Sequence, residues 1–464
     1  MADLTLEDRL RQCGIRILLH DDPGFVTSLG SFSGSHRDNT PRLVALPTNG
    51  QQVATIVSEC IAGGAALVVR GGGHDMFGRF TRRDAVSIDL RNLNSVQVAA
   101  DKKSASVGGG VTASQVANAL RVEGLQVPIG SCGAVGFTGW SLVGGFGPYS
   151  QYYGLGADQI TGARVVNAEG KIVQADEQLL KGLRGGGGCL GIVVELTVKV
   201  YPMEGIQAGQ LLFDSSNLEK AVTTFFSGYE ALLESNGGKL PRQLSVAPSI
   251  LSIPGLGVTM ICGIIWNGPA CDESQLWIDR VASLAPMLTM PGPPQPLTLS
   301  TDPATQMDLH TSMLPKEVSG RTETVSLQRF SPNVTATLAT LATKLPTSSV
   351  GGLLMHILRA DSPSVSQDVP VSVCPYREPQ IVVEILGVAL DQDTAAPAAA
   401  WAEGARRDLS ELEDALKQTY LPMTSPDVLD LHAVYKDKLA ELKVLKQQYD
   451  PDGVFAHAIP NLVR

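Results

Sequence analysis

Short apolar runs alternate with clusters of glycine over the first 200 residues of the chain. The runs ALVVR, AVSIDL, SASVGGGV and GIVVELTVKV are rich in β-branched residues and bounded by turn residues, so they predict short strands. The stretch ARVVNAEGKIVQA predicts a hairpin that turns at residues 168–170. This part of the chain is therefore expected to consist mainly of strands and tight turns.

One segment in this region, residues 47–64, has the spacing of a helix. Four apolar residues of PTNGQQVATIVSECIAGG fall on one face: Val53, Ile56, Val57 and Ile61. Either Thr48 or Asn49 can cap the N-terminus, and the glycine pair 63–64 ends the helix. Strands and a helix together predict an α+β domain.

The pattern of predicted elements changes after Tyr201. Apolar strands (GQLLFD, LSVAPSI, VTMICGIIW, GGLLMHILRA and PQIVVEILGVAL) alternate with helical stretches, which predicts an antiparallel sheet flanked by helices. Residues 401–418 and 434–449 are predicted to be helical, and the sequence DPDG at 450–453 ends the second of these helices. The fold class is therefore α+β, with a second domain after the first.

Composition and charge exclude some classes of partner. Of the 464 residues, 44% are hydrophobic and 18% charged, which is enough to build sizeable cores. A net charge of −10 argues against nucleic acid or an anionic membrane as the main partner. No apolar run reaches the roughly 18 residues that a membrane-spanning helix needs. We expect no membrane association.

The cysteines argue against a disulfide scaffold and a structural zinc site. There are seven, dispersed along the chain, with no CxxC pair and no cluster with histidine at zinc spacing. The first 22 residues lack the basic and apolar regions of a secretory signal. We therefore expect an intracellular, cytoplasmic location in a reducing compartment, and no metal.

Three glycine-rich segments carry the candidate chemistry: RGGGHD at 70–75, the long segment 128–160, and LRGGGGCLGIVVEL at 183–196. Each alone is more simply explained as a structural turn. Together they bring many bare backbone N–H groups into one domain, which suits a diphosphate cofactor. No GxGxxG lies between a strand and a clear helix, and no GxxxxGK[ST] is present, so a nicotinamide fingerprint and a P-loop are excluded.

The order and spacing of these segments resemble the berberine bridge enzyme-like family of FAD-linked oxidases, which have the vanillyl-alcohol-oxidase or PCMH-type flavin fold. VVRGGGHDMFG, GSCGAVGFTGW with the following YGLGADQI, LRGGGGCLGIVVEL and the terminal LKQQYDPDGVFAHAIP each resemble a family motif. The resemblance implies an FAD-binding domain over residues 1–205 with its PCMH-type core at about 38–203. It also implies a substrate-binding domain at 206–404 and a segment, 405–464, that returns to the FAD domain.

The resemblance implies that FAD is bound covalently, through His74 to the flavin 8α carbon and through Cys132 to flavin C6. A neutral imidazole and a thiolate are suitable nucleophiles for these carbons, and the glycines give the flat ring clearance. For Cys132 the alternative is an inert buried thiol. The other cofactor-binding residues implied are Arg70, Gly71, Gly72, Gly73, Asp75, Gly78, Gly130, Ser131, Val135, Gly136, Thr138, Gly139, Trp140, Gly145, Tyr153, Gly154, Leu155, Gly191, Ile192 and Val193.

Val135 bears on the electron acceptor. In the resembling family the residue at this position controls access of oxygen to the flavin, and a small valine accompanies oxidases. The resemblance therefore implies O2 as the acceptor and hydrogen peroxide as the product. The alternative is that Val135 is simply a core residue.

Glu384 and Tyr420 are the candidate catalytic bases. Glu384 interrupts the apolar strand PQIVVEILGVAL on the same face as Val382 and Leu386, and a carboxylate there needs a partner or a cavity. It aligns with the family's Glu or Gln that faces the flavin, and Tyr420 resembles the tyrosine of its Y-x-N segment. The alternative for Glu384 is a structural salt bridge, with Arg377 or Arg359.

Two departures from the family pattern leave the substrate open. Trp140 stands where the family has a histidine, and Pro422 replaces the asparagine of Y-x-N. Trp140 either stacks on the cofactor or substrate or packs in the core. We expect a monomeric or homodimeric oxidase that acts on a small secondary-metabolite alcohol, phenol or amine, with or without oxidative cyclisation. The alternatives are a flavin dehydrogenase with another acceptor and a flavin-containing cyclase that performs no redox step.

Overall fold

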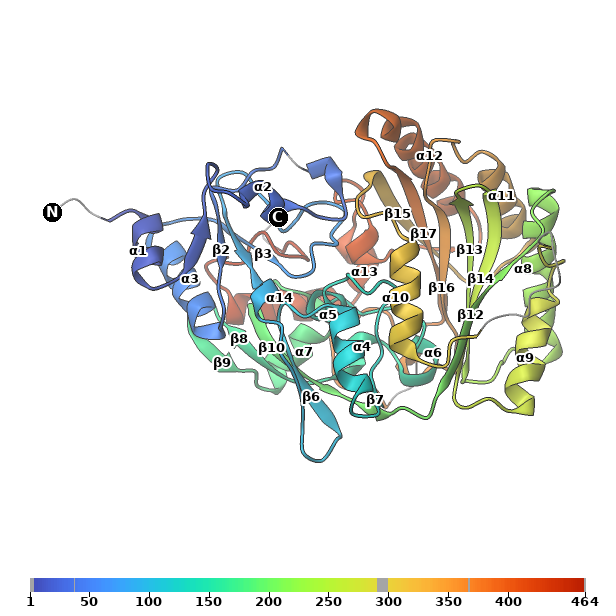
Figure 1. Ribbon diagram of the computed structural model, residues 1–464, viewed down its shortest axis with the longest axis horizontal. Coiled ribbons are helices and arrows are strands. Elements are labelled where there is room, and N and C mark those ends of the chain that lie inside the picture. Colours follow the sequence, from blue (N-terminus) through green and yellow to red (C-terminus); the bar gives the residue numbers. More distant parts are fainter. Residues whose placement is uncertain (1–3, 37, 290–298, 366–367, 463–464) are drawn as a thin grey trace.

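The computed structural model describes residues 4–36, 38–289, 299–365 and 368–462. Figure 1 shows an elongated molecule in which the first 200 residues, blue to green, form one half and the yellow to orange segments form the other. The C-terminus lies among the blue elements, so the chain ends in the half where it began. The structure has the α+β fold expected from the sequence.

A small sheet begins the first half. It has the strand order β1-β2-β4-β3, in which β2, β4 and β3 run parallel and β1 is antiparallel to β2. The strands are β1 (Arg16–Leu18), β2 (Leu43–Leu46), β3 (Leu67–Arg70) and β4 (Val86–Asp89). Helix α3 (Gly50–Ala62) confirms the predicted helix, and the side chain of Asn49 caps it by accepting the N–H of Gln52. Helix α1 (Leu6–Gln12) contacts α3.

A second, five-stranded antiparallel sheet completes the first half, in the order β5-β6-β10-β8-β9. Its strands are β5 (Val96–Val98), β6 (Ser104–Gly108), β10 (Ile192–Lys199), β8 (Ile160–Val166) and β9 (Ile172–Gln174). The predicted hairpin is β8 and β9, with Val166 opposite Ile172. The helices that pack on this sheet are α4 (Ala113–Arg121), α5 (Phe137–Leu142), α6 (Ser150–Tyr153) and α7 (Glu177–Gly186).

The other half is built on a seven-stranded antiparallel sheet, as the sequence predicts. In spatial order its strands are β12 (Ile206–Leu212), β14 (Gly257–Asn267), β13 (Leu244–Ile253), β16 (Gly352–Leu358), β17 (Gln380–Ala389), β15 (Ser319–Leu327) and β18 (Ala415–Leu416). One face of the sheet packs against helices α8 (Leu218–Ser235), α9 (Asp272–Ala282), α11 (Pro332–Thr343) and α12 (Gln392–Ser410). The opposite face looks toward the first half, and α10 (Pro303–Met313) contacts α4 there.

The prediction of one helix over residues 401–418 is wrong at both ends. Helix α12 already begins at Gln392 and contains Pro397, because its buried alanines pack closely on β15 and β17. It ends at Ser410, and residues 415–416 form β18, which pairs with β15. The sheet, rather than local periodicity, therefore decides the conformation after residue 410.

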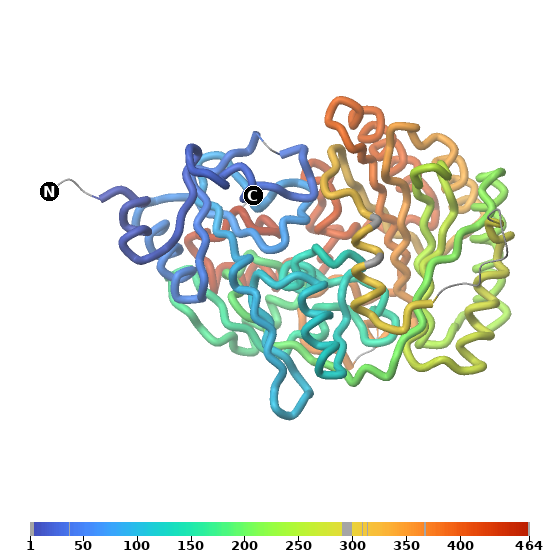
Figure 2. Tube along the Cα trace, viewed as in Figure 1, coloured from blue at the N-terminus to red at the C-terminus, as the bar shows by residue number. Residues whose placement is uncertain are grey.

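The helical pattern at 434–449 is divided between two helices, α13 (Leu431–Tyr435) and α14 (Lys438–Tyr449). Lys436 between them has a φ of 50°, which interrupts the helix. Leu442 and Leu445 of α14 lie in the same core as Leu180 and Leu183 of α7. In Figure 2 this red segment runs back among the blue and green parts of the trace.

No helix within the described ranges has both the length and the apolarity to cross a bilayer. The face of the large sheet opposite α8, α9, α11 and α12 points toward the glycine-rich loops of the first half. The space between them holds the candidate site.

Candidate functional site

A cavity of about 1010 Å³ lies between the two halves. On one side its wall consists of the glycine-rich loops that follow β3 and precede α5. On the other side it consists of residues from β13, β14, β16 and β17. Residues 457–459 of the C-terminal segment also contribute. Two halves that are distant in sequence thus share one cavity.

Most of the predicted site residues line this cavity: Gly71, Gly72, Gly73, His74, Asp75, Gly130, Ser131, Cys132, Val135, Gly136, Thr138, Gly139, Trp140, Gly191, Ile192, Val193, Glu384 and Tyr420. The other predicted residues lie behind the wall: Arg70, Gly78, Gly145, Tyr153, Gly154 and Leu155. The guanidinium of Arg70, for example, donates to the carbonyls of Ser28 and Gly30. The phenol of Tyr153 accepts from Gln126 at 2.8 Å. These residues support the loops from outside the cavity.

Close backbone contact explains why glycines are needed in the wall. A Cβ added at Gly136 would lie 2.6 Å from the backbone nitrogen of Gly72, and a Cβ at Gly72 would clash with the backbone of Ala134 and Gly136. Gly73 adopts a φ of 77°, in the region that favours glycine. The two loops therefore pack backbone to backbone, which brings His74 of one loop next to Cys132 of the other.

His74 presents a neutral imidazole at the cavity wall. Burial lowers the pKa of its ring to about 4, so the ring is uncharged at neutral pH and one nitrogen keeps its lone pair. The ring of Phe32 stacks on it with a centroid separation of 4.7 Å and an interplanar angle of 14°. The side chain is therefore both nucleophilic and held in one orientation.

The thiol of Cys132 faces His74, with 4.0 Å between Sγ and Nε2. Burial raises the pKa of this thiol, although hydrogen bonds from the backbone of Ala134 and Val135 oppose the effect. The resting form at neutral pH is thus the thiol rather than the thiolate. Helix α10 lies over this loop, where Thr311 accepts the N–H of Gly133 at 2.8 Å.

Trp140 packs tightly against neighbouring residues and also lines the cavity. Its indole N–H donates to the carbonyl of Phe146 at 2.8 Å, and its ring covers Gly145 and Gly156 so closely that a Cβ at either would contact it. Its orientation is set by packing, and one part of the side chain remains available to a ligand.

The alternative salt bridges proposed for Glu384 are wrong. Arg377 pairs with Asp158 at 2.7 Å and Arg359 with Asp361 at 3.1 Å. The partner of Glu384 is His356 on β16, with 3.0 Å between Nε2 and Oε2. Glu384 and Leu386 line the cavity as predicted, since side chains alternate along the strand.

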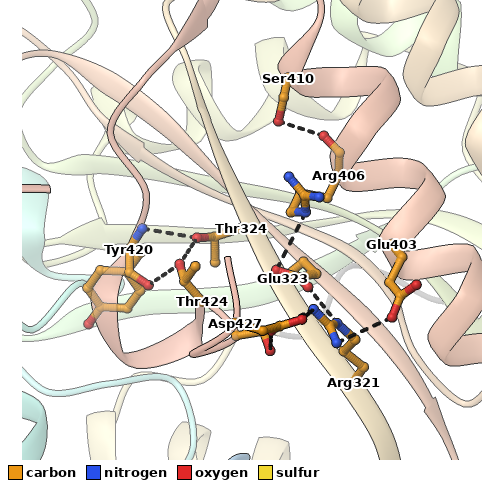
Figure 3. Close-up of polar contacts among 10 residues, drawn as sticks. Arg321, Glu323, Thr324, Glu403, Arg406, Ser410, Tyr420, Thr424 and Asp427 are labelled. Atoms are coloured by element: carbon orange, nitrogen blue, oxygen red, sulfur yellow. Dashed lines mark hydrogen bonds and ion pairs between the residues drawn. The ribbon is translucent and has the colours of Figure 1, made fainter. Parts of the chain in front are cut away.

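Tyr420 is buried at the edge of the cavity and held by its backbone (Figure 3). Its N–H donates to the hydroxyl of Thr324 at 3.0 Å, and its carbonyl accepts from Thr424 at 2.8 Å. Burial raises the pKa of the Tyr420 phenol, and the charge of Glu384 raises it further. The phenol is therefore protonated at neutral pH, which disfavours it as a base.

Sequence reasoning missed two side chains of the site, Phe32 and His356. Phe32 lies in a segment with no recognisable motif. His356 carried a usable signal, because it alternates with the leucines of the apolar strand GGLLMHILRA just as Glu384 does in its own strand. A polar residue on the same face of two neighbouring strands indicates a shared cavity.

Comparison with known proteins decides the family. An FAD binding domain model matches residues 41–176. The chain is 30% identical over 422 residues to the FAD-linked oxidoreductase aurO of Gibberella zeae, an alignment that covers 89% of this chain and 79% of that protein. The chain belongs to the berberine bridge enzyme-like family of FAD-linked oxidoreductases. This berberine bridge enzyme-like protein is thus an FAD-dependent oxidoreductase.

Other relatives of this berberine bridge enzyme-like protein agree in fold. The (R)-6-hydroxynicotine oxidase of Paenarthrobacter nicotinovorans is 31% identical over 191 residues, which are 40% of this chain and 42% of that enzyme. Physcomitrella patens BBE-like 1 superposes with a TM-score of 0.81 at 19% identity over 97% of both chains. Glucooligosaccharide oxidase from Acremonium strictum superposes with a TM-score of 0.79 at 19% identity, over 97% of this chain and 98% of that one. That enzyme is described with a 6-S-cysteinyl, 8α-N1-histidyl FAD.

The residues present fit FAD. The glycines of the wall leave backbone exposed along a cavity long enough to reach both halves, and added Cβ atoms would close the contact between its loops. A neutral imidazole and a thiol stand 4.0 Å apart on that wall. Both are side chains that can hold a flavin.

Proposed function

We propose that this protein is an oxidase that removes hydride from a carbon of a small-molecule alcohol, phenol or amine, a secondary metabolite, and delivers the electrons to O2 as hydrogen peroxide. The observation that carries the proposal is the arrangement of the cavity. His74 and Cys132 lie on the wall of the FAD domain, and Glu384 lies on the wall of the other domain. A substrate between the walls would touch both cofactor and acid–base group.

His74 and Cys132 are proposed to hold FAD covalently, at the flavin 8α carbon and at C6. In each link an N–H or S–H bond and a flavin C–H bond are replaced by one N–C or S–C bond, so each link releases two electrons and two protons, which O2 takes up as hydrogen peroxide. The lowered pKa of His74 supports this role, since a neutral ring is the nucleophilic form. Phe32 would orient that ring.

FAD supplies the redox chemistry, because it accepts hydride from carbon and passes two electrons to oxygen. The chain positions the substrate and moves its proton. Glu384, paired with His356, is proposed to form the acid–base group at the cavity wall, since Tyr420 is protonated. Val135 contributes a small side chain to the wall beside Cys132, which is proposed to leave room for O2.

The covalent links are tested by acid precipitation followed by mass spectrometry of flavin-bearing peptides. We expect flavin on peptides that contain His74 and on peptides that contain Cys132. The variant C132A should keep the histidyl link, and H74A should keep the cysteinyl one. Flavin that is released completely by acid from the unmodified protein contradicts both links.

The acceptor is tested without knowing the substrate, by reducing the holoenzyme with dithionite and mixing it with aerated buffer. We expect the oxidised flavin band to return within seconds and hydrogen peroxide to accumulate. Return over minutes or longer would assign the protein to the dehydrogenases. Once a substrate is known, turnover without bleaching of the flavin band would indicate a non-redox cyclase.

A further inference from the structure

His356 and Glu384 lie side by side on the wall of the substrate domain. They come from neighbouring strands β16 and β17, where Glu384 is opposite Leu354 and His356 is two residues further along. The next residues of each strand, Met355 and Ile385, belong to the helix-covered core. The two side chains are 25% and 16% exposed, so both reach the cavity while remaining sheltered.

The neighbouring titratable groups are already engaged. Arg359 donates to Asp361 and to the carbonyls of Leu244 and Pro241. Across the cavity, Arg79 pairs with Asp75 at 2.6 Å. The phenol of Tyr420 is protonated, as burial raises its pKa. The pair His356–Glu384 is therefore the group on this wall that is placed to accept a proton.

Chemistry decides which atom of the pair is available. A carboxylate can only accept hydrogen bonds, so a neutral His356 carries its proton on Nε2, which faces Glu384. Its other nitrogen, Nδ1, then presents a lone pair, and no hydrogen-bond partner for Nδ1 is found among the described residues. This is the arrangement in which a carboxylate orients an imidazole base.

The part of the wall beside the pair is apolar and suits a flat ligand. Leu354 and Leu386 flank the pair on its own strands. Further along the sheet Ala247 lies opposite Gly263, and a Cβ added at Gly263 would meet nothing closer than Ala247 at 3.5 Å. The apolar and small side chains leave room for a ring beside the pair, while Ser245 and Ser249 of β13 offer hydroxyls on either side of Ala247.

We infer that His356 and Glu384 act as one proton-accepting pair and that the substrate is an uncharged ring compound with a weakly acidic hydroxyl, a phenol. This inference rests on the proposed oxidase function and names its substrate class. The hydroxyl proton moves to Nδ1 of His356, the electron pair stays on the substrate oxygen, and the O–H bond is replaced by an N–H bond. The carboxylate of Glu384 balances the imidazolium charge that results.

The experiment uses 4-nitrophenol as the probe, because its phenolate absorbs visible light and the phenol does not. The probe is added to the holoenzyme at about one pH unit below the probe's own pKa, where about nine-tenths of the free probe is protonated. We expect bound probe to show phenolate absorbance with the unmodified protein. That ionised fraction should fall about tenfold or more in H356N and E384Q.

The matched control is H432N, which removes an exposed histidine on α13 that does not line the cavity. It should ionise the probe as the unmodified protein does. Retained ionisation in H356N would overturn the inference, and so would a lack of ionised bound probe in the unmodified protein. Unfolding midpoints and flavin spectra of all variants show whether they are folded and loaded.

A second measurement uses only the unmodified protein and so does not depend on whether the variants fold. In 15N spectra of histidine-labelled holoenzyme, we expect one neutral histidine protonated on Nε2, whose Nδ1 signal moves on addition of 4-nitrophenol. Histidine signals that do not respond to the probe contradict the inference. Failure of the proposed function would give a different result. The protein would then have no flavin band, or its reduced flavin would not be reoxidised by air, whether or not bound 4-nitrophenol is ionised.

Discussion

The orientation of His74 depends on a single aromatic neighbour. Phe32 stacks on the imidazole at 4.7 Å, and its carbonyl accepts the N–H of Val318 at 2.8 Å. Val318 in turn accepts from Gly34 at 2.8 Å, so the segment that carries Phe32 is tied to the half of the molecule that contains the large sheet. An imidazole that must attack one carbon needs this kind of restraint, because reaction rates fall steeply when the attacking atom is misplaced.

We therefore predict that F32L reduces covalent attachment at His74 several-fold while leaving attachment at Cys132 unchanged. The loss of the stacked ring frees the imidazole to rotate away from the attacking geometry. Acid-stable flavin on each peptide measures the two links separately. F77L is the control. Phe77 lies three residues after His74, but its ring contacts the guanidinium of Arg79 rather than the imidazole. Equal attachment in F32L and the unmodified protein would contradict the restraint.

At the scale of an element, β15 carries two different polar networks on its two faces (Figure 3). On the cavity face the hydroxyls of Thr324 and Thr424, 2.7 Å apart, hold the backbone of Tyr420. On the helix face Glu323 is fully buried and accepts from Arg321 at 2.6 Å, while Arg406 of α12 lies 3.9 Å away. Burial raises the pKa of the Glu323 carboxyl despite these cations.

The raised pKa of Glu323 has a consequence for the dependence of stability on pH. A carboxyl whose pKa is higher in the folded than in the unfolded state binds its proton more tightly when folded, so its contribution to stability is lost as the pH rises through the raised pKa. We predict that E323Q shows a smaller fall in unfolding midpoint than the unmodified protein between about pH 4.5 and about pH 7.

Thermal unfolding followed by circular dichroism measures this difference. E403Q serves as the control, since Glu403 also pairs with Arg321 but is 54% exposed. Its pH dependence should match that of the unmodified protein. A profile for E323Q that is parallel to the unmodified one would show that Glu323 is not the group that titrates.

At the scale of the whole molecule, ion pairs of two kinds join the halves. Asp158 pairs with Arg377 at 2.7 Å, is 8% exposed, and also accepts from the N–H of Leu155 and the hydroxyl of Ser364. Arg121 of α4 pairs with Asp302 at 2.9 Å on the surface. A buried charge that loses its partner is costly, whereas an exposed pair is screened by solvent.

We predict that D158N lowers the free energy of unfolding by about 3 kcal/mol, because the largely sheltered guanidinium of Arg377, 22% exposed, would lose its counter-charge. D302N should change it by less than about 1 kcal/mol, since its pair is exposed and Asn still caps α10. Urea unfolding of both variants gives the comparison. Similar losses in both variants would mean that the buried pair does not hold the halves together.

A feature of the site could be predicted from the sequence where it depends on residues that are close together in the chain. The glycine loops with His74 and Cys132 were predicted from their glycine clusters and their resemblance to family motifs, and the structure shows that Gly72 and Gly136 are needed where the two loops pack backbone to backbone. Glu384 was predictable as a polar residue in an apolar strand, but its partner was not, and both arginines suggested for it pair elsewhere. Helix α12 was missed at its start because close packing on the sheet tolerates Pro397.

The sequence by itself determined most of the strands, the main helices, the two-part organisation and the glycine-rich segments, because alternation, capping and glycine act over a few residues. Only the tertiary structure decided that Phe32 faces His74, that His356 faces Glu384, and that Asp158 meets Arg377. These contacts join positions 28 to 219 residues apart (384 − 356 = 28; 377 − 158 = 219). No short-range pattern specifies such contacts, since they arise only when whole elements pack together.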